Sequence, residues 1–193
     1  MDKATFMKIL ASDSRDYSNR PLLVNSVMKN KSWVLILLNK INDIENKDSS
    51  FSARILELSC KNDLSLLLPY LDTFVDIIAK LKLDASIRAS AKIIELLTIQ
   101  YFIQKEELYI KNMTNSHLEL FTEYCFDWMI NEKAIAIQAH SMYALYLIGR
   151  KYNWVHPALI TLIERNLPSG SAGYKNRGKK VIYAIRTNTN YRL

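Results

Sequence analysis

Histidine and cysteine are the residue types in this sequence best suited to metal binding or nucleophilic chemistry. The chain has three histidines and two cysteines. A metal site normally needs such ligands on one helical face or in one tight loop. His117, His140 and His156 are isolated from one another, and Cys60 and Cys125 lie 65 positions apart. We therefore predict no metal, no cofactor and no catalytic residue. The histidines are expected to cap or pack helices, and the cysteines to be buried, reduced thiols.

Glycines gather in one place, the segment Ser169-Gly170-Ser171-Ala172-Gly173. The backbone amides of such a loop can bind an anion when the loop leads into a helix. A flexible turn between two helices explains the same residues, so both interpretations stay open. The sequence has no Walker loop and no Gly-x-Ser-x-Gly nucleophile motif.

Carboxylates recur at intervals of four on two predicted helices, which places each series on one helical face. Such a surface would attract a basic peptide or protein segment and repel phosphate. An ordinary solvated helix face is the alternative. The residues predicted to bind a protein or peptide partner are Asp72, Asp76, Glu119, Glu123, Asp127 and Trp154.

The net charge of +7 is concentrated at the end of the sequence. Six basic residues and no acidic one lie between Ser171 and Leu193, and Tyr183 and Tyr191 are near enough to stack on bases. The segment is either a binding surface for nucleic acid or another anion, or the solvated face of a terminal repeat. The candidate nucleic-acid-binding or anion-binding residues are Lys175, Arg177, Lys179, Lys180 and Arg186, with Arg192 beyond them.

The composition predicts an all-α fold. Apolar residues make up 49% of the 193 residues and recur three and four positions apart, whereas only 4 Gly and 4 Pro are present. The first residues lack the apolar run of a secretory signal, and the longest uncharged stretch, from Ala134 up to Arg150, is too short to span a bilayer. We expect a cytoplasmic protein that does not enter a membrane.

One residue pattern recurs four times: an apolar residue, a polar one, a small or apolar residue at the fifth position and an apolar residue at the eighth. The copies begin at Phe51, Ile87, Ile137 and Tyr174, at intervals of 36, 50 and 37 residues. Recurrence of one helical pattern at intervals of this length indicates a helical repeat protein.

Second helices are predicted between the copies, and N-caps are predicted where new helix pairs begin. The expected second helices are 63–83, 115–131 and 153–166, preceded by a shorter pair at 21–30 and 32–45 and a capping helix at 1–11. Asp48, Asp84 and Asn131-Glu132 offer N-cap side chains. We predict one domain, 1–193, with capping helices in 1–47, central helix pairs in 48–170 and a basic helix and tail in 171–193.

The segment from Asp84 to Leu97 resembles the first helix of a HEAT repeat. The resemblance implies a right-handed α-α superhelix of about five helix pairs. In that family a small fifth residue lets paired helices approach closely, and the polar second residue, here Arg88, helps to bind neighbouring repeats. Ser52 and Gln138 depart from the expected Arg. The 50-residue interval implies a long loop around 104–114.

We predict a non-catalytic scaffold or adaptor, because the sequence has no recognisable catalytic motif. In HEAT-like proteins the second helices line a concave binding surface, so the resemblance would place the carboxylates above on that surface. A distant branch, the alkylpurine DNA glycosylases, holds a lesion with aromatic residues beside a carboxylate. Asp127, Trp128 and Trp154 have the residue types for that role, although Trp128 is equally explained as a core residue. Protein binding is thus the first hypothesis, and nucleic-acid binding or repair is the alternative.

Overall fold

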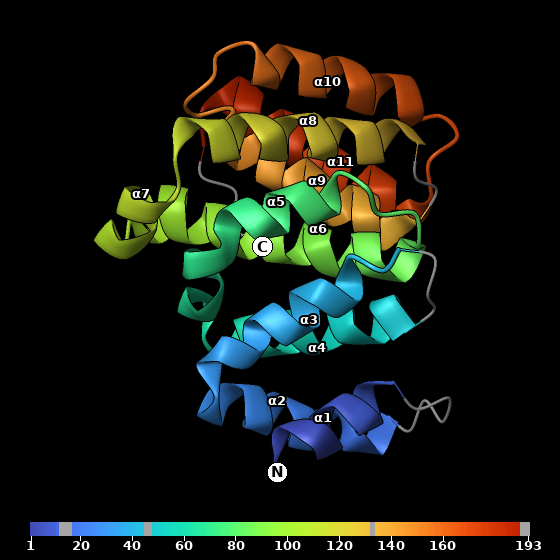
Figure 1. Cartoon of the computed structure of the whole chain (residues 1–193). Coiled ribbons are helices and arrows are strands. Elements are labelled where there is room, and N and C mark those ends of the chain that lie inside the picture. Colours follow the sequence, from blue (N-terminus) through green and yellow to red (C-terminus); the bar gives the residue numbers. More distant parts are fainter. Residues whose placement is uncertain (12–16, 45–47, 132–133, 190–193) are drawn as a thin grey trace. The chain divides into compact units, whose positions relative to one another are not determined.

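The computed structural model of the chain describes residues 1–11, 17–44, 48–131 and 134–189. All regular elements in these ranges are helical (Figure 1), so the all-α prediction is confirmed. Glu132, Tyr191 and Arg192, which the sequence analysis named, lie outside the described residues. In the described part of the chain, no helix is both long enough and apolar enough to cross a bilayer.

The chain divides into two compact units, Met1–Ile93 and Ile94–Leu193. The division falls inside helix α6, Asp84–Ile99. The boundaries given above for a single domain stay a prediction.

The N-terminal unit is built around α4, which packs against α2 and α3. Its helices are α1 Lys3–Leu10, α2 Arg20–Lys29, α3 Val34–Ile41, α4 Asp48–Asn62 and α5 Leu71–Ile78. In α3, the apolar residues at positions one, four, five and eight are buried, as expected of an amphipathic helix with one core-facing side.

The second helix predicted at 63–83 is divided in the structure. A 3-10 segment, Leu64–Tyr70, comes first, and α5 begins only at Leu71. Pro69 lies inside the 3-10 segment. Because proline lacks an N–H and its ring clashes with the carbonyl four residues earlier, it disfavours a continuous α-helix through this point. Asp63 caps the segment by accepting from the backbone N–H of Ser65 at 3.0 Å.

The C-terminal unit consists of two layers of helices (Figure 1). Helices α8 and α10 lie in front, with α9 and α11 behind them, and α9 packs against the other three. Every side chain from Ser141 to Ile148 is buried, which explains the long uncharged stretch of the sequence. The helices are α7 Glu107–Asn112, α8 Asn115–Asn131, α9 Ile135–Ile148, α10 Val155–Asn166 and α11 Ala172–Thr187.

The four copies of the sequence pattern lie in α4, α6, α9 and α11, so their helical prediction is confirmed. The loop expected around 104–114 is partly wrong, because α7 occupies its centre after a π-helical turn at Gln100–Gln104. Lys105 ends that turn in the left-handed conformation. An ion pair of 2.7 Å between Glu107 and Lys111, one helical turn apart, supports α7, and the buried ring of Tyr109 anchors it.

Candidate functional site

Helix α8 carries three of the predicted partner-binding carboxylates. Two hydrogen bonds between neighbouring residues cap its N-terminus. His117 Nδ1 accepts from the backbone N–H of Thr114 at 3.1 Å, and Thr114 Oγ1 accepts from the backbone N–H of His117 at 3.3 Å. This reciprocal pair satisfies donors at the helix N-terminus. The capping role predicted for His117 is confirmed.

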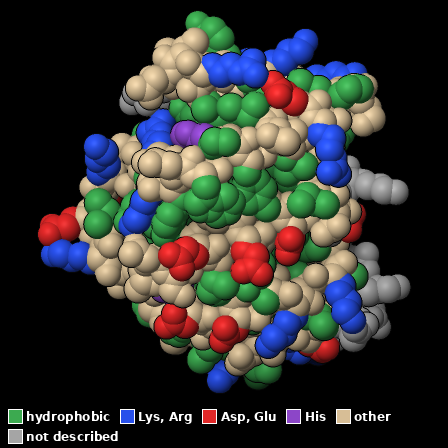
Figure 2. Space-filling model, turned by 90° about the horizontal axis from the view of Figure 1, so that it is seen from above, with side chains coloured by type: hydrophobic (Ala, Val, Ile, Leu, Met, Phe, Trp, Pro, Cys, Tyr) green, Lys and Arg blue, Asp and Glu red, His purple; other side chains and the backbone are tan. Residues whose placement is uncertain are grey.

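The exposed side of α8 forms one wall of a groove of about 490 Å³, which we call the acidic groove. Its lining residues are Glu119, Thr122, Glu123, Phe126, Asp127, Tyr152 and Trp154. The groove thus joins four of the six residues predicted to bind a partner. Figure 2 shows a row of acidic side chains beside exposed hydrophobic ones.

Trp154 forms the aromatic wall of the acidic groove. Its side chain is 59% exposed, an unusual state for the largest apolar residue. The indole stacks on Phe126, with ring centroids 5.8 Å apart and an angle of 24° between the planes. One face of the indole is therefore held by the protein while much of the side chain remains open to solvent.

The segment that carries Trp154 is tied to the start of α8. Lys151 Nζ donates to Asn115 Oδ1 at 2.6 Å and to the hydroxyl of Tyr101 at 3.2 Å, and the Tyr152 hydroxyl donates to the carbonyl of Asn115 at 3.4 Å. Burial raises the pKa of Tyr152, and the charge of Glu119 adds to that rise against the opposing effect of Lys151. These contacts position the aromatic wall opposite the carboxylates.

The carboxylates of Glu119, Glu123 and Asp127 are exposed and form no ion pair with any residue that the structure describes. Their charge is therefore not neutralised by a described neighbour. Asp72 and Asp76 are exposed on α5, which belongs to the N-terminal unit. The residues that line the acidic groove all belong to the C-terminal unit. The predicted acidic set is thus divided between the two units.

Trp128 does not join Asp127 and Trp154 at the surface. Its side chain is buried and stacks on Tyr124, with centroids 6.3 Å apart. The interpretation of Trp128 as a core residue is confirmed. Trp128 is therefore not available to hold a lesion beside Asp127, whereas Asp127 and Trp154 both line the acidic groove.

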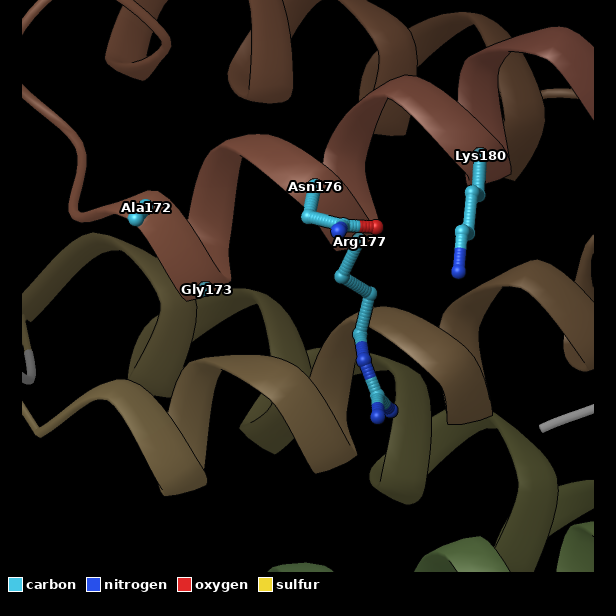
Figure 3. Close-up of a pocket in the computed structure, with 5 residues that line it drawn as sticks. All are labelled: Ala172, Gly173, Asn176, Arg177 and Lys180. Carbon is cyan, nitrogen blue, oxygen red and sulfur yellow. The ribbon is translucent and has the colours of Figure 1, made fainter.

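The basic residues predicted to bind an anion lie on two sides of α11. Arg177 and Lys180 line a hollow of about 380 Å³ with Ala172, Gly173 and Asn176 (Figure 3), which we call the Arg177 hollow. Arg177 Nη1 donates to the carbonyl of Ala139 on α9 at 3.2 Å, so the guanidinium is half-buried between the helices.

On the other side of α11, Lys179 and Arg186 line a second hollow of about 470 Å³ with Ile182 and Tyr183. Arg186 forms an ion pair of 2.6 Å with Glu164 of α10. Lys175 lies half-buried on the same helix. The structure therefore divides the rest of the predicted basic set between two hollows, one on each side of the exposed face of α11.

The glycine segment before α11 forms a tight turn. Ser171 caps the helix by accepting from the backbone N–H of Tyr174 at 3.1 Å. A Cβ atom at Gly170 would come within 2.8 Å of the Tyr174 ring, so only glycine fits this close approach. The turn interpretation accounts for Gly170.

Sequence reasoning did not find a polar cluster inside the C-terminal unit. The carboxylate of Glu95 is fully buried, and the imidazole of His140 donates to it from Nδ1. Burial raises the pKa of the nearby Cys125 thiol to about 12, and the charge of Glu95 adds to this effect. A thiol with so high a pKa is a poor nucleophile. The third histidine, His156, donates from Nε2 to the carbonyl of Tyr146 at 2.9 Å.

These groups also give no metal centre. In the described ranges, no group of three or more His, Cys, Asp or Glu side chains is arranged to hold a metal ion. We compared the chain with known proteins. No family model, curated protein or solved structure matches it.

Proposed function

We propose that the chain is a non-catalytic scaffold that binds a basic segment of a partner protein in the acidic groove. The observation that carries this proposal is the combination, in one groove, of three exposed carboxylates without described ion-pair partners and an exposed, stacked indole. An aromatic face beside carboxylates suits a Lys or Arg side chain, because the cation gains both an ion pair and a cation–π contact.

The spacing of the carboxylates supports a peptide ligand. Residues four apart on a helix are separated by about 6 Å along its axis. Alternate residues of an extended peptide lie about 6.5 Å apart on one side. An extended segment with basic residues at every second position would therefore match Glu119, Glu123 and Asp127 in turn.

The proposal includes a HEAT-like arrangement of the helix pairs. Its support in the C-terminal unit is the two-layer packing of α8 with α9 and of α10 with α11. In the N-terminal unit, Arg88 of α6 lies 3.9 Å from the carboxylate of Glu57 on α4, which joins two predicted first helices. A cytoplasmic location also belongs to the proposal, supported by the two buried, free thiols of Cys60 and Cys125.

The test is titration of the full chain with a fluorescein-labelled peptide of alternating Lys and Ala, followed by fluorescence anisotropy. We expect Glu123→Lys and Trp154→Ala each to weaken binding by about tenfold, which corresponds to the loss of one desolvated charge pair or cation–π contact. We also expect the affinity of the unchanged protein to fall as salt rises.

A matched control is Glu106→Lys, which makes the same charge change in the same unit at an exposed residue outside the groove. This variant should bind as the unchanged protein does. The proposal fails if the unchanged protein does not bind the peptide at low salt, or if Glu123→Lys and Glu106→Lys reduce binding equally.

A further inference from the structure

Helix α11 differs from the rest of the chain in its charge. It contains five basic residues and no acidic one between Ala172 and Thr187. Arg186 is paired with Glu164. Lys175, Lys179 and Lys180 form no ion pair with any residue in the described ranges. Apart from Arg186, the positive charges of the helix therefore have no described anionic partner.

The exposed residues of α11 form one face with an aromatic residue at its centre. Tyr183 is 64% exposed and lies one helical turn from Lys179 and Lys180 on one side and from Arg186 on the other. Its buried neighbours on the opposite face, such as Val181, pack into the unit. An aromatic ring surrounded by cations is a surface suited to stacking a base beside its phosphates.

The Arg177 hollow adds a defined position for an oxyanion. In Figure 3, the side chains of Arg177 and Lys180 extend from α11 in the same direction, toward the neighbouring helices, with the amide of Asn176 close by. The hydrogen bond from Arg177 to the carbonyl of Ala139 holds the guanidinium in place. A guanidinium has five N–H donors, so donors remain for a ligand after this bond is made.

We propose that the exposed face of α11 binds single-stranded nucleic acid, with one backbone phosphate in the Arg177 hollow and a base stacked on Tyr183. The cations alone would suit any polyanion. The exposed tyrosine favours a single strand, because only an unpaired strand offers base faces to an aromatic side chain. Arg186, already paired with Glu164, contributes least to this surface.

This surface is separate from the acidic groove. The groove is lined by α8 and the segment before α10, whereas the Arg177 hollow is lined by α11 alone. The carboxylates of the groove would repel a phosphate backbone. Nucleic-acid binding on α11 is therefore independent of peptide binding in the acidic groove. Glu123→Lys should not weaken the binding of nucleic acid.

The experiment measures binding of the full chain to a labelled oligothymidine of about 15 nucleotides, within the range of single-strand site sizes. Fluorescence anisotropy is followed between about 50 and 200 mM salt. The variants are Arg177→Gln/Lys180→Gln and Tyr183→Ala. The control is Lys80→Gln, which removes a charge from an exposed lysine of the N-terminal unit. Circular dichroism establishes that each variant remains helical.

We expect the double variant to reduce the slope of log affinity against log salt by about 0.7, since both side chains hold the one phosphate proposed for the Arg177 hollow and each phosphate contact on a single strand contributes about 0.7. Tyr183→Ala should weaken binding by about tenfold at every salt concentration without changing the slope. Lys80→Gln should leave both quantities unchanged.

Three results would overturn the proposal. The first is no binding by the unchanged protein at low salt. The second is a double variant with the same affinity and slope as Lys80→Gln. The third is a duplex of equal length that binds as tightly as the single strand and is insensitive to Tyr183→Ala, which would show that base stacking plays no part.

Discussion

The imidazole of His140 on α9 donates a hydrogen bond to the fully buried carboxylate of Glu95 on α6. A carboxylate removed from water is costly unless it is hydrogen-bonded. The pair therefore links α6 to α9. Loss of either side chain would leave the other without its hydrogen-bond partner and would lower the stability of the fold.

Replacing His140 by Ala should lower the free energy of unfolding by about 3 kcal/mol, because it removes a partner of a buried charge. Glu95→Gln should cost about 1 kcal/mol, since the amide keeps the shape and can still hydrogen-bond. Urea denaturation measures both. The double variant should cost at least 1 kcal/mol less than the sum, because no buried charge is left unpaired. Strict additivity would show that the two side chains are not coupled.

Glu57 should make stability depend on pH in the acid range. Burial alone would raise the pKa of its carboxyl, but hydrogen bonds from Arg54 at 2.5 Å and Lys61 at 2.8 Å outweigh burial and lower that pKa below its usual 4.5. The stabilisation is therefore complete above pH 4.5 and is lost as the pH falls through the lowered value.

Glu57→Gln should cost about 2 kcal/mol of unfolding free energy at neutral pH. This difference from the unchanged protein should shrink as the pH falls below 4.5 and approach zero at the pH where the carboxyl is protonated in both folded and unfolded states. Urea midpoints measured at several pH values test it. A difference that stays constant down to that pH would contradict the assignment of the lowered pKa to Glu57.

The two cysteines should be protected from thiol reagents in the folded protein. Burial raises the pKa of both thiols, that of Cys125 to about 12. Because only the thiolate reacts, modification by a disulfide reagent at mildly alkaline pH should be slower than that of a free cysteine by about a thousandfold or more. In urea both thiols should react at once. Rapid modification of the folded protein would show that a thiol is accessible.

The helices and part of the acidic groove could be predicted because their signals are local. The spacing of Glu119, Glu123 and Asp127 requires only that α8 be a helix, and α8 runs over the predicted residues 115–131. Trp154 could be proposed as a partner-binding residue, but its stacking on Phe126 could not, because that contact depends on how α10 packs against α8.

No local sequence pattern predicted the buried polar contacts. Glu95 and His140 are 45 positions apart and share no local pattern. Arg177 looked like one of several exposed cations, yet its bond to Ala139 depends on the packing of α11 on α9. Contacts of this kind are fixed by tertiary packing and cannot be read from helical periodicity.

Gly178 tests the idea that a small residue at the fifth position of the repeated pattern lets helices pair closely. A Cβ atom at Gly178 would lie 2.7 Å from Cγ2 of Ile163 on α10. Alanine is a better helix former than glycine by about 1 kcal/mol. Overpacking at a helix contact costs about 2 kcal/mol. Gly178→Ala should therefore lower the free energy of unfolding by about 1 kcal/mol.

Gly173→Ala is the matched control on the same helix. Its added Cβ would lie 3.5 Å from Ile135, an ordinary contact, so only the helix preference should act. The free energy of unfolding should rise, by about 0.5 kcal/mol because the residue lies in the first turn. Opposite signs for the two substitutions would assign the cost at Gly178 to the approach of α10. Equal stabilisation of both variants would show that α10 and α11 can separate without loss, and would remove the packing reason for a small residue at this position.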